Sequence, residues 1–290
     1  MFFLTYGDKG PRVVLVQTLL RLKGIDVRIN GIWDNDCLNA VMEYRKKLNL
    51  HPMGPIDPKV FFNLIQDSRL KVIDSLDASA GEVAAVTQKE MHQAGINVLM
   101  NERVPGRGVA NAVDKIIKRS KDHRIGLLRI FGHGNGGNWI SVALGDPYHL
   151  RKSGHQQEYE ALKADWQSYL DYSHYERHRP ALKKIKPLFA PFASAEIHSC
   201  TVGTVQQKLI RKLADTWGVP VVAGKGLQSV GGYFQNQWGE QVPYTFVMEG
   251  ELFTAYPNNG DLRSWAAGIE ASVPNLARAF KYIKEKLTII

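Results

Sequence analysis

The sequence predicts an α/β protein, with a small three-helix domain followed by a larger domain whose mostly parallel sheet is flanked by helices. Apolar residues recur at helical spacing over about the first 68 residues, whereas from about Leu70 short β-rich runs alternate with helical stretches. A length of 290 residues also favours about two domains. We therefore expect domains at residues 1–68 and 70–290.

The first segment has the pattern of three short amphipathic helices separated by glycine turns. Gly24 is placed to end the first helix, and Asp57 and Pro58 are typical of the N-cap and first residue of the third. Three helices of this size are near the limit for a single core. Their apolar faces are Val13, Val16, Leu19 and Leu20, then Cys37, Val41, Tyr44 and Leu48, then Val60, Phe61 and Leu64.

This segment resembles the three-helix peptidoglycan-binding domain over about the first quarter of the chain. The resemblance rests on G-D-K-G-P-R-V-V-L-V-Q-T-L-L-R-L-K-G-I from Gly7, N-G-I-W-D-N-D-C-L-N-A-V-M-E-Y-R-K-K-L-N-L from Asn30, and M-G-P-I-D-P-K-V from Met53. The family often has Phe-Gly at the place of Trp33-Asp34 and Phe-Gln at the place of Tyr44-Arg45. The resemblance implies peptidoglycan as a partner. The alternative is an unrelated three-helix bundle, which would show the same periodicity.

The larger segment alternates between strands and helices, which predicts a mostly parallel sheet covered on both faces. The expected strands are 71–76, 96–100, 125–131, 195–200 and 219–223, with a further strand at 244–249. The expected helices are 81–94, 109–120 and 204–217, with a helical tail at 274–286.

A helical insertion at about 147–190 interrupts this rhythm. A lid or specificity element and a helical hairpin packed on the sheet are both compatible with its length. Its residues at helical spacing are Tyr159, Leu162, Trp166, Tyr169 and Leu170, and its basic patch consists of Arg177, Arg179, Lys183, Lys184 and Lys186.

The composition excludes several classes of protein. With 44% apolar and 22% charged residues, the chain is neither disordered, collagenous nor a disulfide scaffold. A net charge of +9 favours contact with polyanions, including nucleic acid, anionic lipid and bacterial envelope polymers. We expect no membrane span, no standard export signal and no cofactor. Cys37 and Cys200 cannot form a disulfide framework or a four-ligand zinc site, and Cys37 is expected to be an inert core thiol.

Two strand ends carry the residues of a cysteine nucleophile. The run 127–131 ends in Gly132-His133-Gly134, and the run 195–199 ends in Cys200. Because the carboxyl ends of parallel strands open onto one edge of a sheet, His133 and Cys200 are expected to converge. A neighbouring imidazole and a helix N-terminus favour the thiolate, and the backbone amides of Gly134 and Cys200 are candidates for an oxyanion hole.

The same pattern resembles the caspase-like clan of cysteine peptidases, which includes caspases, legumain, clostripain and gingipains. A hydrophobic strand ends in His133-Gly134, and after a long interval a second one ends in Ser199-Cys200, followed by Thr201-Val202-Gly203. The resemblance covers about residues 70–250 and implies that Cys200 is the nucleophile and His133 the general base or acid. Ser199 stands where alanine is commoner in that clan.

Other polar residues are weaker candidates. His198 lies two positions before Cys200 and could orient the thiol, or it could be a half-buried strand histidine. Asp146 could orient His133 or bind substrate, with a solvated turn as the alternative. We interpret His149, His155, His174 and His178 as surface residues and expect no metal, although His174 and His178 have i, i+4 spacing.

Together these patterns predict a cell-wall-targeted cysteine endopeptidase, a secreted antibacterial effector toxin or lytic enzyme. Its expected partners are peptidoglycan, a peptide or protein substrate, and a cognate immunity protein or secretion machinery. We expect a bacterial protein secreted without a standard signal peptide that acts in the periplasm or wall of a target cell. The alternatives are an amidase-like or L,D-transpeptidase-like enzyme acting on peptidoglycan, and a non-catalytic wall-binding protein. Nucleic-acid binding through Lys183 to Lys186 lacks an aromatic-basic motif.

Overall fold

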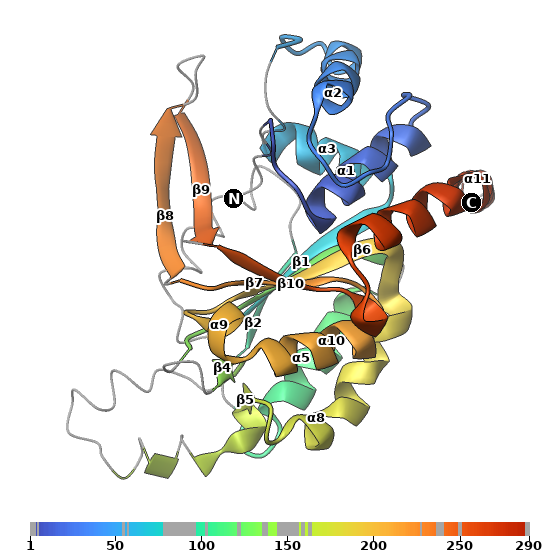
Figure 1. Cartoon of the computed structure of the whole chain (residues 1–290). Helices are drawn as coiled ribbons and strands as arrows, with labels where there is room; N and C mark the ends of the chain where they lie inside the picture. Colours follow the sequence, from blue (N-terminus) through green and yellow to red (C-terminus); the bar gives the residue numbers. More distant parts are fainter. Residues whose placement is uncertain are drawn as a thin grey trace.

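The protein is built around one central sheet. The structure, a computed structural model, describes residues 4, 6–53, 56, 58–77, 97–101, 104–120, 123–134, 139–143, 157, 160–161, 164–226, 228–235, 241–248 and 251–287. The sheet has six strands in the order β10-β7-β6-β3-β1-β2 (Figure 1). They are β1 (Leu70–Asp77), β2 (Asn97–Asn101), β3 (Arg124–Phe131), β6 (Phe189–His198), β7 (Val221–Gly224) and β10 (Leu252–Ala255).

The sheet is parallel except at one edge. β1 pairs in parallel with β2 and β3, β3 with β6, and β6 with β7, whereas β10 runs antiparallel to β7. β1, β3, β6 and β7 are almost wholly buried, as expected for strands covered on both faces. The predicted α/β class is confirmed.

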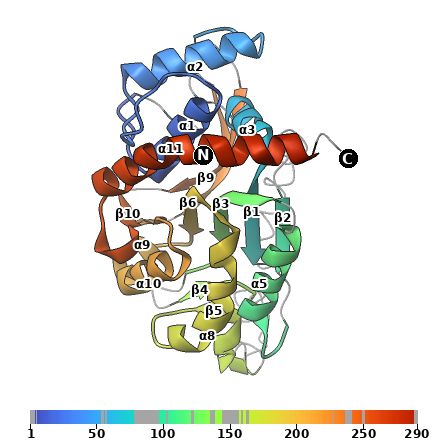
Figure 2. The ribbon, with the colours of Figure 1, turned by 90° about the vertical axis from the view of Figure 1, so that its right-hand side faces the viewer.

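Helices form a layer on each face of the sheet (Figures 1 and 2). One layer contains α1 (Pro11–Leu22), α3 (Pro58–Asp67) and α11 (Leu262–Leu287), with α2 (Asn35–Lys47) beyond them. The other contains α5 (Gly108–Arg119), α8 (Tyr175–Leu182) and α10 (Gln207–Trp217). Of the helices described, none is long and apolar enough to cross a membrane.

The other described elements lie outside the central sheet. They are the strands β4 (Ile140–Ser141) and β5 (Tyr169–Leu170), the hairpin of β8 (Gln228–Gln235) and β9 (Gln241–Met248), the helix α9 (Val202–Val205), and the 3₁₀ helices η1 (Trp166–Ser168), η2 (Lys183–Leu188) and η3 (Pro257–Asn259). The hairpin stands beside the sheet, on the side of α1 (Figure 1).

A buried glutamine organises the first helices. The Gln17 side chain donates to Asn30 Oδ1 at 2.8 Å and to Cys37 Sγ at 3.0 Å, and it accepts from the backbone N–H of Gly31 at 2.8 Å. Asp34 caps α2 by accepting from the Cys37 backbone N–H. Cys37 has no exposed surface, so its predicted position in the core is confirmed, and burial raises its pKa to about 11.

The helical segment and the sheet share one apolar core. A single cluster of buried residues runs from α1, α2 and α3 into the strands, and α1 contacts both β6 and α11. The Arg12 guanidinium binds both carboxylate oxygens of Glu196 on β6 at 2.5 Å. At Gly31, an ideal Cβ would lie 2.5 Å from Leu262 Cδ1. The helices are therefore packed onto the sheet rather than tethered beside it.

Three predicted elements differ in extent. β6 begins at Phe189 and contains a bulge around Pro191, since five steps along β6 match two along β3 and proline has no N–H for the ladder. α11 begins at Leu262, where the Asp261 carboxylate caps the Ser264 N–H at 2.7 Å, so Pro274 lies inside the helix. The predicted helix 204–217 divides into α9 and α10. The predicted helix 81–94 and the N-cap Asp57 lie outside the described residues.

The predicted insertion contains regular structure in its second half. Trp166 lies in η1, while Tyr169 and Leu170 form β5 and pair with β4, so the predicted helical phase is wrong at these positions. Tyr159 and Leu162 lie outside the described residues. α8 and η2 contact α5 and α10, and they lead directly into β6. This half is part of the helical layer that connects β3 to β6.

Candidate catalytic site at the carboxyl edge of the sheet

His133 and Cys200 follow neighbouring strands. The last paired residues of β3 and β6 are Phe131 and His198, and the Gly132 N–H extends the ladder by donating to the His198 carbonyl at 3.1 Å. His133 and Cys200 each lie two positions beyond that last pair. The parallel topology thus brings the two strand ends to one edge of the sheet, as the sequence predicts.

The backbone of His133 is held on both sides by Ser141 of β4. The His133 N–H donates to Ser141 Oγ at 2.7 Å, and the Ser141 N–H donates to the His133 carbonyl at 2.9 Å. Ser141 is fully buried, whereas the His133 side chain is exposed. A fixed backbone with an accessible imidazole suits a group that must exchange protons with a substrate.

The glycines on either side of His133 permit close backbone approach. An ideal Cβ on Gly132 would lie 1.9 Å from the Ser141 carbonyl oxygen. One on Gly134 would lie 2.6 Å from the Cys200 carbonyl oxygen and 3.3 Å from the Cys200 nitrogen. The loop after β3 therefore lies directly against the backbone of Cys200, so the two predicted oxyanion residues, Gly134 and Cys200, are neighbours in space.

A sharp turn presents Cys200. Thr201 has left-handed backbone angles, φ 58° and ψ 6°, which are unfavourable for a β-branched residue. The turn is held by hydrogen bonds from the Thr201 N–H to the Gly226 carbonyl at 2.8 Å and from Thr201 Oγ1 to the Cys200 carbonyl at 2.8 Å. Cys200 itself is partly exposed. Strain of this kind is concentrated at functional sites, where the surrounding structure maintains it.

His198 is a fully buried strand residue. Its Nε2 lies 3.0 Å from Glu196 Oε2, and its ring stacks on Phe131 with 4.5 Å between centroids. Burial lowers the pKa of His198 to about 4, although the Glu196 carboxylate acts in the opposite direction. The imidazole is therefore neutral at pH 7, and its Nε2 is engaged by Glu196 beneath the site.

A row of buried charges crosses the sheet below His198, and sequence reasoning missed it. Arg129 on β3 binds Asp74 on β1 through two hydrogen bonds, and its register partner on β6 is Glu196. Arg12 of α1 then binds Glu196. Burial acts to raise the pKa of Glu196, but the Arg12 guanidinium and His198 hold it well below its usual value. The available signal was a charged residue among mainly apolar ones in β1, β3 and β6, namely Asp74, Arg129 and Glu196.

Asp146 and the four histidines of the insertion were the weaker candidates for the site. Asp146, His149 and His155 lie outside the described residues. His174 Nδ1 binds Asp171 at 2.9 Å. His178 is only 5% exposed and its Nε2 lies 3.1 Å from the Trp166 carbonyl oxygen, so its interpretation as a surface residue is wrong. Within the described ranges, no three His, Cys, Asp or Glu side chains gather into a metal-binding group.

Comparison with known proteins gives a short match to a protease. No protein-family model matches this chain. The carboxy-terminal processing protease CtpA of Bacillus subtilis (strain 168) is 27% identical over 85 residues, which are 29% of this chain. The chain spans only 18% of the length of that relative.

Proposed function

We propose that this chain is a cysteine peptidase in which Cys200 is the nucleophile and His133 the proton carrier. The observation that carries the proposal is the meeting of two loops at one edge of the sheet, with Gly134 packed against the backbone of Cys200. A nucleophile, a base and two backbone amides at one place are the parts that acyl transfer requires.

The chemistry follows from these parts. His133 takes the thiol proton, and the Cys200 sulfur attacks the carbonyl carbon of a peptide bond. The N–H groups of Gly134 and Cys200 stabilise the oxyanion. The C–N bond then breaks, His133 protonates the departing amine, and water hydrolyses the thioester to release the acid and the thiol. The resemblance to the caspase-like clan supports these roles, and the match to a processing protease supports peptide-bond cleavage at the level of class.

The location of the activity is a second part of the proposal. The resemblance of residues 7–60 to the peptidoglycan-binding domain supports the bacterial wall as the place of action. A wall-binding surface fixed on the enzyme would raise its effective concentration near substrates. We propose that the enzyme acts in the periplasm or wall of a target cell, as a secreted effector or lytic enzyme restrained by an immunity protein in the producer.

Mass spectrometry of the products tests the activity. The chain and its Cys200→Ala and His133→Ala variants are incubated with a mixed-sequence peptide library and with purified peptidoglycan. His51→Ala is the matched control, because His51 is an exposed histidine in the loop between α2 and α3 and not at the end of a sheet strand. New peptide termini should be produced by the chain and by His51→Ala and be absent with the other two variants.

The remaining outcomes decide against the proposal. Altered muropeptides without peptide cleavage would identify an enzyme that modifies peptidoglycan. Cleavage that persists in Cys200→Ala would exclude the thiol mechanism. Sedimentation of Cys200→Ala with insoluble peptidoglycan tests wall binding separately, and a protein that stays in the supernatant at 0.15 M salt would remove the wall from the proposal.

A further inference from the structure

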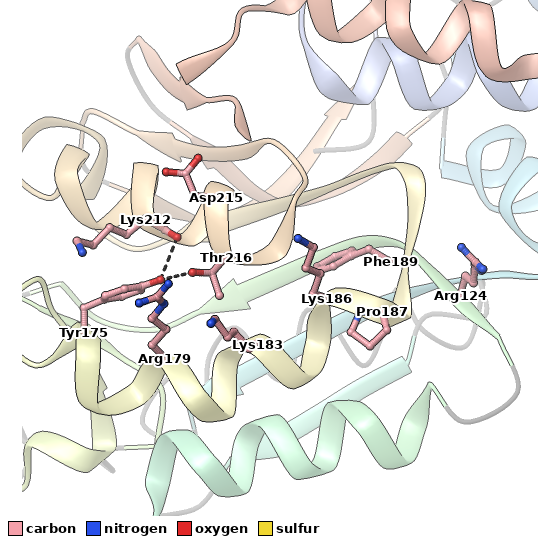
Figure 3. Close-up of a pocket in the computed structure, with 10 residues that line it drawn as sticks. All are labelled: Arg124, Tyr175, Arg179, Lys183, Lys186, Pro187, Phe189, Lys212, Asp215 and Thr216. Atoms are coloured by element: carbon pink, nitrogen blue, oxygen red, sulfur yellow. Dashed lines mark hydrogen bonds between the residues drawn. The ribbon is translucent and has the colours of Figure 1, made fainter. Parts of the chain in front are cut away.

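A large cavity lies at the opposite edge of the sheet from Cys200. Its volume is about 930 Å³, and it lies where β3 and β6 begin, between η2 and the end of α10 (Figure 3). Its charged lining consists of Arg124, Arg179, Lys183, Lys186, Lys212 and Asp215. Five cationic side chains therefore face one carboxylate.

The charges in this cavity are only partly balanced. Glu176 binds Lys212 at 2.6 Å and Arg179 at 3.2 Å. Asp215 accepts a hydrogen bond from the Asn258 backbone N–H at 2.7 Å. Arg124, Lys183 and Lys186 form no ion pair with any carboxylate in the part of the chain that the structure describes. Three cations thus remain available to a ligand.

The backbone aligns two of these cations. Lys183 and Lys186 are three positions apart in η2, and residues at this spacing lie one above the other in a 3₁₀ helix. The Lys186 side chain passes over Gly218, where an ideal Cβ would lie 3.2 Å from Lys186 Cε. Lys184 is also exposed but does not line the cavity.

The cavity wall is rigid and partly apolar. Tyr175 is 2% exposed and Phe189 5% exposed. The Tyr175 hydroxyl donates to the Lys212 carbonyl at 3.1 Å and also contacts the Thr216 hydroxyl, so the ring is fixed between α8 and α10 (Figure 3). A fixed aromatic wall lined by several cations is an arrangement that can hold an anionic ligand.

We propose that this cavity binds a small molecule that carries two or more phosphate groups. Lysine ammonium groups bind phosphate as point charges, and arginine binds it through paired N–H groups. The volume lies near the upper end of the range for small-molecule sites, which exceeds the needs of a single inorganic anion. The site is independent of the proposed peptidase, since it lies at the other end of the strands.

Calorimetry with tripolyphosphate at 0.15 M salt tests this site. Lys183→Ala/Lys186→Ala should weaken binding by at least about tenfold, because both residues line the cavity and neither forms an ion pair within the described residues. Lys46→Ala/Lys184→Ala is the matched control, because it also removes two positive charges, but from exposed positions outside the cavity. It should change the affinity by less than about threefold. Cys200→Ala should bind as the unmodified chain does, whether or not it cleaves peptides.

Three results would overturn the proposal. Equal weakening in both double variants would show that net charge alone attracts the anion. Orthophosphate that binds as tightly as tripolyphosphate would show a site for a single anion. A 20-nucleotide single strand that binds more tightly than tripolyphosphate and loses affinity equally in both variants would show a general polyanion surface. Thermal melting of both variants verifies that each is folded.

Discussion

Replacing Arg12 with methionine would leave a buried carboxylate without its guanidinium. The Glu196 side chain is 4% exposed and that of Arg12 is 16% exposed, and the two are joined by bonds of 2.5–2.8 Å. Removing one partner of a buried ion pair costs about 3–5 kcal/mol. We expect Arg12→Met to lower the free energy of unfolding by about 3 kcal/mol at pH 8, the lower end of that range, because His198 remains as a partner of Glu196.

The pH dependence of this loss carries more information than its size. In the unmodified chain the pKa of His198 is about 4, below its usual value. Between about pH 6.5 and pH 4, the unfolded state therefore binds more protons than the folded state does. Stability is therefore lost with falling pH over that window, by at most about 3 kcal/mol. In Arg12→Met, the His198 imidazolium becomes the nearest replacement cation for Glu196, while Arg129 stays bound to Asp74. Its pKa should rise, and the stability difference between the two proteins should shrink from pH 8 to pH 5.

Urea unfolding at several pH values measures this difference. Arg21→Met is the matched control, because Arg21 also lies on α1 but pairs with Asp26, which is 97% exposed. Loss of an exposed pair should cost no more than about 1 kcal/mol, with little dependence on pH. Arg12→Met/Glu196→Gln should regain part of the stability. A loss below about 1 kcal/mol, or a difference that stays constant from pH 8 to 5, would refute the assignment of Arg12 as the main counter-ion of Glu196.

The remaining predictions concern the glycines and the thiols. Gly132→Ala should lower the melting temperature, because its Cβ would collide with the Ser141 carbonyl. Gly268→Ala, in an open position of α11, should instead raise the free energy of unfolding by about 1 kcal/mol. A similar effect of the two substitutions in thermal unfolding would contradict the close packing of the loop after β3. Gly134→Ala should reduce peptide cleavage at least about tenfold at unchanged folding, since the loop could no longer lie against Cys200; full activity in a peptide assay would separate Gly134 from the oxyanion site. Iodoacetamide should modify Cys200 in the native chain and Cys37 only after denaturation, as read by mass spectrometry; rapid native labelling of Cys37 would contradict its burial.

The helices and parallel strands were predictable because hydrophobic periodicity determines them. The location of His133 and Cys200 at the same edge of the sheet followed from the strand alternation, since neighbouring parallel strands end on the same edge. The first and last residues of the elements were less predictable. β6 continues through Pro191 by forming a bulge, and α11 begins at a cap formed by Asp261. These outcomes depend on local hydrogen bonds that a periodicity does not contain.

The supports of the candidate site could not be predicted from the sequence. Ser141 fixes His133 from a two-residue strand, which is too short to give a pattern. The partners Arg12 and Glu196 are 184 positions apart, and no spacing rule joins them. Charged residues within apolar strands showed that ion pairs were needed, but only the packing of α1 on the sheet identifies which residues meet.

The shared core has a consequence for dissecting the chain into parts. Val72 and Leu127 of the strands belong to the same buried cluster as Leu15 and Leu19 of α1, and by strand alternation they lie on the face of the sheet that carries Glu196. A fragment starting at residue 69 would expose these strand residues to water and leave Glu196 without Arg12. Such a fragment should self-associate through its bared sheet. Studies of wall binding and catalysis are therefore better separated by point substitutions in the intact chain than by cutting it between α3 and β1.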